Sequence, residues 1–168
     1  MSYFVNGHFA RSDDAGFIMV SGDESIDFLQ SILTANVATV AIGDCRPAAL
    51  LTPQGRILID MMVYRTSHQD IFLQTDQERA DDLLNRLRRY RLRRPVTLER
   101  SIDIQLTCWW GYDGTKKPDD ADIFLDPRHT DLGCRIISRN ADVPSTVNGA
   151  RPASYEVWQA RRIGQAIP

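Results

Sequence analysis

The chain has 168 residues, of which 43% are hydrophobic, 25% charged and 8% aromatic, a composition typical of one globular domain or two small ones and unlike a disordered or collagen-like chain. Twenty Lys and Arg against 22 Asp and Glu give a net charge of -2, which argues against nucleic acid or an anionic membrane as partner of the whole surface. No run approaches the ~20 apolar residues of a membrane span, and the N-terminus lacks signal-peptide and transit-peptide patterns, so we expect a cytoplasmic protein.

The N-terminal segment predicts a strand followed by a helix. The apolar run at 17–20 is typical of a short buried strand, and the SGDE sequence at 21–24 is a capping box. A helix should follow it, because Ile26, Leu29 and Leu33 recur at helical spacing. These residues are expected to face the core.

A hairpin and a long helix come next. The hairpin is predicted over 48–64, where a Thr-Pro-Gln-Gly turn at 52–55 joins two apolar runs. A strand over 71–75 leads into a second capping box that starts at Thr75, and the helix after it should end before Pro95. The residues predicted to share its buried face are Ala80, Leu83, Leu84, Leu87 and Tyr90.

The rest of the chain predicts more strands and a final helix. Strands are expected over 96–99, over 102–110 and twice within 123–138, loops over 111–122 and 139–151, and a helix over 154–165 with Tyr155, Trp158 and Arg162 on one side. Strands therefore outnumber helices.

These elements predict an α+β fold with antiparallel sheets and packed helices, because the strands come mostly as hairpins. Residues from about 47 to 110 should form a ββ(β)αββ unit of ferredoxin-like character. We expect this unit to belong to a domain over about 47–138. Residues 1–46 and about 139–168 would then form a first, discontinuous α+β domain.

Cysteines and histidines give no sign of a metal or disulfide framework. Cys45, Cys108 and Cys134 are odd in number and widely separated, with no CxxC and no histidine at ligand spacing. No histidine has the neighbours of a catalytic triad, and no glycine pattern predicts a nucleotide phosphate site. We expect no metal site.

Asp60 is the most informative polar residue. On a regular strand it shares one face with Arg56, Leu58 and Met62, and its neighbours on both faces are apolar. A strand that is apolar on both faces is normally covered on both, so this carboxylate should be partly desolvated. It either forms an ion pair with an arginine or serves as a pocket carboxylate that binds an NH-rich heterocycle or a substrate amine.

Six arginines are concentrated in nine positions at 86–94, where positive charge complements the end of the long helix. The cluster is either a solvated helix face or an anion or partner dock, for which Arg88, Arg89 and Arg91 are the candidates. Phosphate contacts to nucleic acid are a weaker alternative, because the chain is net acidic.

Several segments together resemble the folate-binding YgfZ family, relatives of the glycine-cleavage T-protein (aminomethyltransferase), over its N-terminal portion. They are VSGDESIDFLQSILTANV at 20–37, ALLTPQGRILIDMMVY at 49–64, LLNRLRRYRLRRPV at 83–96, DPR at 126–128 with LGCR at 132–135, and YEVWQARRIGQAIP at 155–168. They follow the family's order across nearly the whole chain.

The resemblance implies a tetrahydrofolate-binding accessory protein for iron-sulfur cluster assembly or repair, with a three-domain, cloverleaf-like arrangement. Asp60 matches the aspartate that T-proteins place against the pteridine, and Leu58, Met62 and Arg56 would line the same folate site. The implied cofactor is tetrahydrofolate or a derivative. The implied partners are iron-sulfur assembly or client proteins, without a membrane.

Departures from the family pattern bear on activity. Ile59 stands where T-proteins carry a first aspartate and Arg56 where they often carry Gly, and their glycine-rich RTGYTGEDG-like stretch is not visible. The family's KGCYxGQE motif and C-terminal β-barrel domain would follow Pro168, so we expect an N-terminal fragment or a short form. A folate-dependent aminomethyltransferase-like enzyme is the alternative, with little independent activity expected, and an RNA-binding module is a further one.

Overall fold

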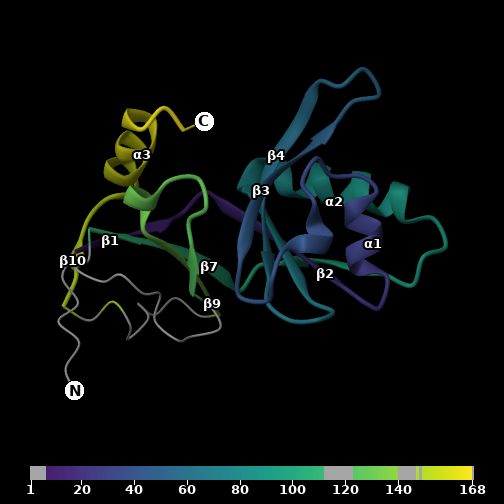
Figure 1. Cartoon of the computed structure of the whole chain (residues 1–168), viewed down its shortest axis with the longest axis horizontal. Coiled ribbons are helices and arrows are strands. Elements are labelled where there is room, and N and C mark those ends of the chain that lie inside the picture. The colour runs from purple at the N-terminus through teal and green to yellow at the C-terminus, as the bar shows by residue number, and fades with distance from the viewer. Residues whose placement is uncertain (1–6, 112–122, 140–146, 148, 168) are drawn as a thin grey trace. The chain divides into compact units, whose positions relative to one another are not determined.

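The structure is a computed structural model that describes residues 7–111, 123–139, 147 and 149–167. The chain divides into two compact units, labelled by their elements in Figure 1. Unit 1 comprises Met1–Asp13 and Asp103–Pro168, and unit 2 comprises Asp14–Ile102. Both contain a sheet and at least one helix, so the α+β class is confirmed.

Unit 2 is built on a five-stranded sheet in the order β3-β4-β5-β2-β6. Its strands are β2 (Ala15–Ser21), β3 (Cys45–Leu51), β4 (Ile57–Arg65), β5 (Ile71–Asp76) and β6 (Thr97–Ser101). All neighbouring strands are antiparallel. Strand β2 lies between β5 and β6 in this sheet, which explains why the unit begins near residue 14.

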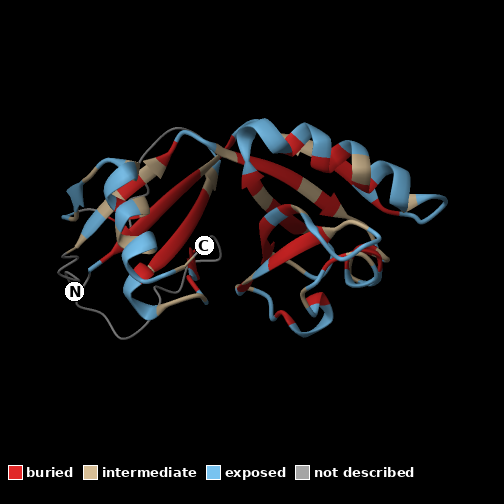
Figure 2. Cartoon of the chain, turned by 90° about the horizontal axis from the view of Figure 1, so that it is seen from above, coloured by how far each residue is buried: buried red, intermediate tan, exposed pale blue. Residues whose placement is uncertain are grey.

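Helices cover one face of this sheet. They are α1 (Ser25–Gln30), η1 (Val37–Thr39) and α2 (Gln77–Arg91). Figure 2 shows α2 with its buried positions toward the sheet and its exposed positions outward. The core between sheet and helices includes Ile18, Val20, Phe28, Leu29, Leu50, Ile59, Met61, Val63, Ile71, Leu73, Leu83, Leu84 and Leu87. The apolar stripe predicted for the long helix is confirmed, except that Tyr90 is exposed.

The two predicted capping boxes are wrong in detail. The N-cap of α1 is Glu24 and that of α2 is Asp76, and neither makes a side-chain capping hydrogen bond. Thr75 is still in β5, and its Oγ1 donates to the carbonyl oxygen of Asp60 at 2.9 Å. Because this hydroxyl is used across the sheet, it does not cap the helix. Leu33 lies beyond α1 and forms an isolated bridge with Leu50.

Unit 1 contains a second five-stranded sheet, in the order β10-β1-β7-β9-β8. Its elements are β1 (His8–Ser12), β7 (Ile104–Trp110), β8 (Ile123–Leu125), η2 (Thr130–Leu132), β9 (Cys134–Arg139), β10 (Arg151–Pro152) and α3 (Tyr155–Gly164). The β1 and β10 strands are parallel and the other pairs antiparallel. Helix α3 contacts β1 and η2.

The predicted unit over 47–110 differs from the observed sheets. Strands β6 and β7 follow one another in sequence but belong to different sheets, with the exposed Ile102 between them. Strand β2 completes the sheet instead, so the expected domain boundaries at 46–47 and 138–139 differ from the observed division. The predicted loops over 111–122 and 139–151 fall mainly outside the described residues.

Among the helices that the structure describes, none combines the length and the apolar character needed to cross a membrane.

Candidate functional site

Asp60 lies on the face of the unit 2 sheet that the helices do not cover. Residues that pair directly across antiparallel strands share a face. Asp60 pairs with Ala49, and Met62 pairs with Pro47 and Gln74. The alternate residues of β4 that belong to the helix-side core, Ile59, Met61 and Val63, point the other way. Asp60 and Met62 therefore share the face opposite the helices, as predicted.

Leu58 does not share that face. The pairing shifts between Leu50, which is opposite Ile59, and Leu51, which is opposite Ile57, so Leu58 is the extra residue of a bulge. Its side chain packs against the helix-side core. The prediction that Leu58 flanks Asp60 is therefore wrong, because a bulge breaks the period of two on which it rests.

Asp60 is exposed, and it forms no ion pair with any residue that the structure describes. The expected desolvation and the expected structural ion pair are thus both absent from the described part of the chain. Its backbone is held by the hydrogen bond from Thr75, while the adjacent Met62 is only 4% exposed. The result is an available carboxylate on a fixed strand beside buried apolar surface.

An aromatic cluster stiffens the same face. Phe17 lies 6.4 Å from Tyr64 and 6.5 Å from Phe72 between ring centroids, the latter edge-on. All three side chains are buried, and Phe17 pairs with Gln74, which pairs in turn with Met62. These rings hold β4, which contains Asp60, together with β5 and β2.

Arg56 lies at the β3–β4 hairpin turn, just before β4 begins. The Thr52 amide donates to the Arg56 carbonyl oxygen at 2.8 Å, and the Arg56 amide donates to Thr52 Oγ1 at 3.1 Å, which closes the turn. Its side chain is exposed. Arg56 precedes Asp60 by four positions, so their Cα atoms lie at most about 13 Å apart along the strand, at ~3.3 Å per residue.

The predicted dock at the end of α2 divides into two kinds of arginine. Arg88 and Arg89 are exposed in the last turn of the helix. Arg91 is half-buried, and its Nη1 donates to the Val96 carbonyl oxygen at 3.2 Å. Arg91 therefore holds the following loop in place, and only the other two present their charge to solvent.

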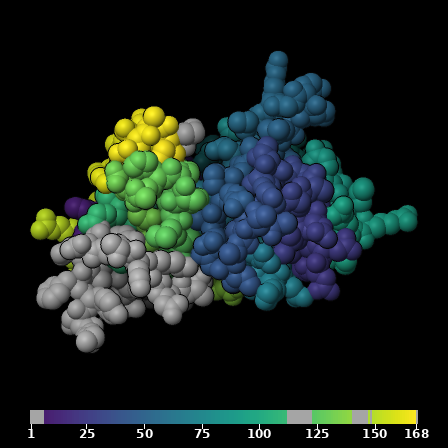
Figure 3. Space-filling view, viewed as in Figure 1, coloured from purple at the N-terminus to yellow at the C-terminus, as the bar shows by residue number. Residues whose placement is uncertain are grey.

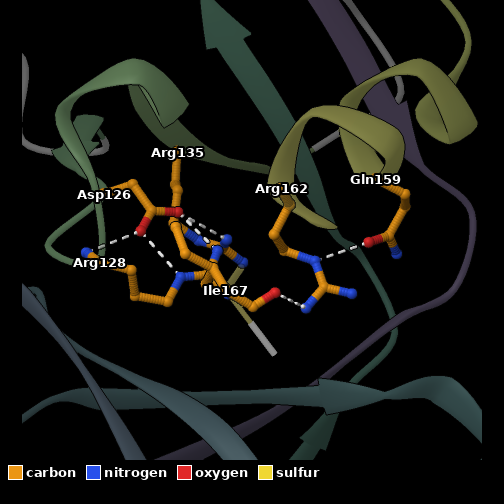
Figure 4. Close-up of polar contacts among 6 residues, drawn as sticks. All are labelled: Asp126, Arg128, Arg135, Gln159, Arg162 and Ile167. Carbon is orange, nitrogen blue, oxygen red and sulfur yellow. Dashed lines mark hydrogen bonds and ion pairs between the residues drawn. The ribbon is translucent and has the colours of Figure 1, made fainter. Parts of the chain in front are cut away.

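Unit 1 contains a buried polar cluster around Asp126 (Figure 4). Arg128 Nε donates to Asp126 Oδ1 at 2.9 Å and Nη2 donates to Oδ2 at 2.7 Å, while Arg135 Nη1 donates to Oδ2 at 3.2 Å. Burial alone would raise the pKa of Asp126, but the hydrogen bonds from Arg128 and the charge of Arg135 lower it below the ordinary value. Asp126 is therefore a carboxylate held ionised inside the protein.

Trp158 of α3 closes this cluster. The guanidinium carbons of Arg128 and Arg135 lie 5.7 and 5.6 Å from the Trp158 ring centroid, within cation–π range. Tyr155 stacks on the same ring at 5.4 Å. One turn further along α3, Arg162 Nε donates to Gln159 Oε1 at 2.8 Å (Figure 4). The two cation–π contacts attach α3 to the β8–β9 segment, whereas the other two are internal to the helix.

The DPR and LGCR segments match the family pattern but carry no role predicted from the sequence. Asp126 and Arg128 come from the first and Arg135 from the second. The sequence feature that could have predicted this ion pair is the DxR spacing, because it lets an arginine contact the carboxylate two residues earlier. The ion pairs and cation–π contacts described above all join residues of unit 1, and we assign the cluster a structural role.

The described residues contain no group of three or more His, Cys, Asp or Glu that could hold a metal ion. The three cysteines, all within the described residues, are buried and form no disulfide. Burial raises the pKa of Cys108 to about 12, against the charge of Arg135, which lowers it.

Comparisons with known proteins agree with this fold. An iron-sulfur cluster assembly factor IBA57 homolog (mitochondrial) of Pyricularia oryzae is 26% identical over 161 residues, covering 89% of this chain and 40% of that protein. An aminomethyltransferase of Exiguobacterium sibiricum is 32% identical over 88 residues, covering 52% of this chain and 24% of its own length. This chain thus spans two fifths or less of these relatives.

The glycine cleavage system aminomethyltransferase T from Bartonella henselae is similar in fold, with a TM-score of 0.56 at 19% identity over 61% of this chain and 28% of that one. The model of the GCVT N-terminal domain matches residues 13–107, which include Asp60 and all of β2 to β6. Since the match covers more than half of the chain, the protein belongs to the GCVT N-terminal domain family.

Proposed function

We propose that this chain is a tetrahydrofolate-binding accessory protein for iron-sulfur cluster assembly or repair. The observation that carries the folate part is Asp60, an exposed carboxylate with no ion-pair partner among the described residues, on a strand inside the GCVT match. The iron-sulfur part is supported by distant homology to assembly factors along most of the chain.

The residues on this face fit the chemistry of a pterin ring. Such a ring presents an amide N–H beside an exocyclic amino group, and one ionised carboxylate accepts from both. Asp60 would orient the ring, and Met62, which is only 4% exposed, would support the strand beneath it rather than form an open contact surface. Arg56 would meet a carboxylate at the far end of the ligand. Bound tetrahydrofolate would supply nitrogen atoms that carry one-carbon groups.

An aminomethyltransferase-like activity is the second candidate, supported by the similarity to the enzyme of Exiguobacterium sibiricum. Ile59, which stands where T-proteins carry another aspartate, is 2% exposed and packs in the helix-side core. This strand therefore presents one carboxylate rather than two. We expect little or no turnover in a glycine-cleavage assay with lipoylated carrier protein and tetrahydrofolate.

The cloverleaf-like arrangement of three domains belongs to the proposal for the whole protein, as does the ferredoxin-like character of unit 2. The cytoplasmic location stays a prediction too, since the fungal relatives have "mitochondrial" in their names.

Calorimetry with 5-formyltetrahydrofolate tests the folate proposal. Asp60→Ala and Asp60→Asn should each weaken binding by about 1.5–3 kcal/mol, because they remove the charge-assisted hydrogen bonds. Asp27→Asn is the matched control, since Asp27 is also exposed but lies on α1, on the other side of the sheet. Equal affinity for wild type, control and both Asp60 variants would refute the assignment.

A further inference from the structure

The end of α2 presents positive charge that the described residues do not neutralise. We define the α2 tip as Arg88, Arg89, Tyr90, Leu92, Arg93 and Arg94, all of them exposed. None of its four arginines forms an ion pair with a described residue. Earlier on the same helix, Arg86 pairs with Asp82 at 2.9 Å. The tip therefore differs from the rest of α2 in lacking acidic partners.

Helix-end electrostatics account for only part of this charge. Cations stabilise the last turn of a helix, and that turn contains Arg88 and Arg89. Arg93 and Arg94 lie beyond the end of α2, in the loop that leads to β6. Figure 1 shows this loop at the edge of unit 2, and in Figure 3 teal side chains from this region extend into solvent.

Leu92 is a second feature of the α2 tip, independent of its charge, that suggests a binding surface. Its φ is +53°, a backbone conformation that glycine adopts freely and leucine does not. Its side chain is 82% exposed, so packing within the described structure does not compensate for the strain. The positive φ ends α2, since Leu92 is the C-cap of that helix, so it is the exposed apolar side chain that the fold does not explain.

The tip is also held in shape before any partner arrives. Arg91 donates across the loop to the Val96 carbonyl oxygen, and the Arg94 amide donates to the Arg91 carbonyl oxygen at 3.1 Å. A preformed surface loses less conformational entropy on binding. Arg91 is thus a positioning residue for the tip.

We propose that the α2 tip is a docking surface for an acidic protein segment that carries an apolar side chain between its carboxylates. The arginines would meet the carboxylates, while Leu92 and the 44% exposed ring of Tyr90 would cover the apolar side chain. Leu92 offers a nucleic acid neither stacking nor a hydrogen bond, so the apolar side chain favours a peptide over RNA as the anionic partner. A protein partner fits both features, and this docking does not depend on folate.

Fluorescence anisotropy on the full chain tests the proposal with three labelled probes: an Asp/Glu decapeptide with a central leucine, the same peptide with serine instead, and a single-stranded RNA decamer. We expect the leucine peptide to bind best. Arg93→Glu should weaken it about fivefold at 50 mM salt and less at 200 mM, because exposed charges are screened. Arg79→Glu, the matched reversal in the first turn of α2, should change affinity less than twofold.

Leu92→Gly separates docking from folding, because it removes the side chain and relieves the strained backbone. It should weaken the leucine peptide several-fold, leave the serine peptide unchanged, and keep or raise the melting temperature. Tighter binding of RNA than of the leucine peptide would overturn the proposal. So would equal binding of the two peptides, or unchanged affinity in both Arg93→Glu and Leu92→Gly.

Discussion

Asp126 and Arg128 form a two-pronged ion pair, with Nε to Oδ1 at 2.9 Å and Nη2 to Oδ2 at 2.7 Å, in which the carboxylate side chain is fully buried. Asp126→Asn leaves Arg128 and Arg135 without their common counter-charge. We expect it to destabilise unit 1 by about 3–5 kcal/mol, the usual effect of breaking a buried pair. All three tryptophans of the chain lie in Asp103–Pro168, so tryptophan fluorescence during urea unfolding reports on this unit. A loss below about 1 kcal/mol would contradict the structural role.

The Asp126–Arg128 ion pair also predicts that the free energy of unfolding decreases in acid. The net effect of its surroundings lowers the pKa of Asp126 below its ordinary value of 3.8. Below that value the unfolded chain takes up a proton while the folded one stays ionised, so the stabilisation is complete above about pH 4 and is lost as pH falls further. The difference in unfolding free energy between wild type and Asp126→Asn should shrink from pH 5 to pH 3. A constant difference would show that Asp126 does not titrate as described.

Gly133 is irreplaceable for a steric reason. Its φ is +69°, and a Cβ built on it would lie 2.8 Å from the Trp110 Cα atom. Gly133→Ala should therefore cost at least about 2 kcal/mol, from strain and overlap together. Gly164→Ala is the control in the same unit, since its Cβ would meet nothing within 4 Å. That variant should be neutral or stabilising by up to about 1 kcal/mol, measured by the same fluorescence.

Thr75 connects β5 to the strand of Asp60. Thr75→Val keeps the shape but removes the donor to the Asp60 carbonyl oxygen, which should destabilise unit 2 by about 1–2 kcal/mol. Thr75→Ser keeps the hydroxyl and should cost less. Far-UV circular dichroism during urea unfolding is the measurement, because unit 2 contains no tryptophan. Equal losses in the two variants would mean that the hydrogen bond contributes nothing.

Cys108 should resist alkylation in the folded protein. With its pKa at about 12 instead of 9.0, the thiolate fraction at pH 8 falls from about one in ten to about one in ten thousand, so iodoacetamide should react at least about a thousandfold more slowly. Peptide mass spectrometry over time would follow the modification. The guanidinium-unfolded chain serves as control and should react at an ordinary rate. Rapid labelling of the native thiol would contradict its burial.

The sequence by itself determined the elements that have a strong local period. Leu83, Leu84 and Leu87 recur at helical spacing, and they are buried in α2 as predicted. The run at 17–20 lies in β2, and the hairpin around 52–55 joins β3 to β4. These features can be predicted because the apolar face of a helix and the residues of a tight turn each depend on residues only a few positions apart in the sequence.

Only the tertiary structure decided which strands pair and which side chains are covered. Strands β6 (Thr97–Ser101) and β7 (Ile104–Trp110) are consecutive in the sequence, but they form hydrogen bonds in different sheets. Because of one bulge, Leu58 packs against the core. Asp60 is exposed, whereas the side chain of Asp126 is fully buried. Pairing and burial depend on segments far away in the chain, and a period of two or 3.6 residues carries no information about them.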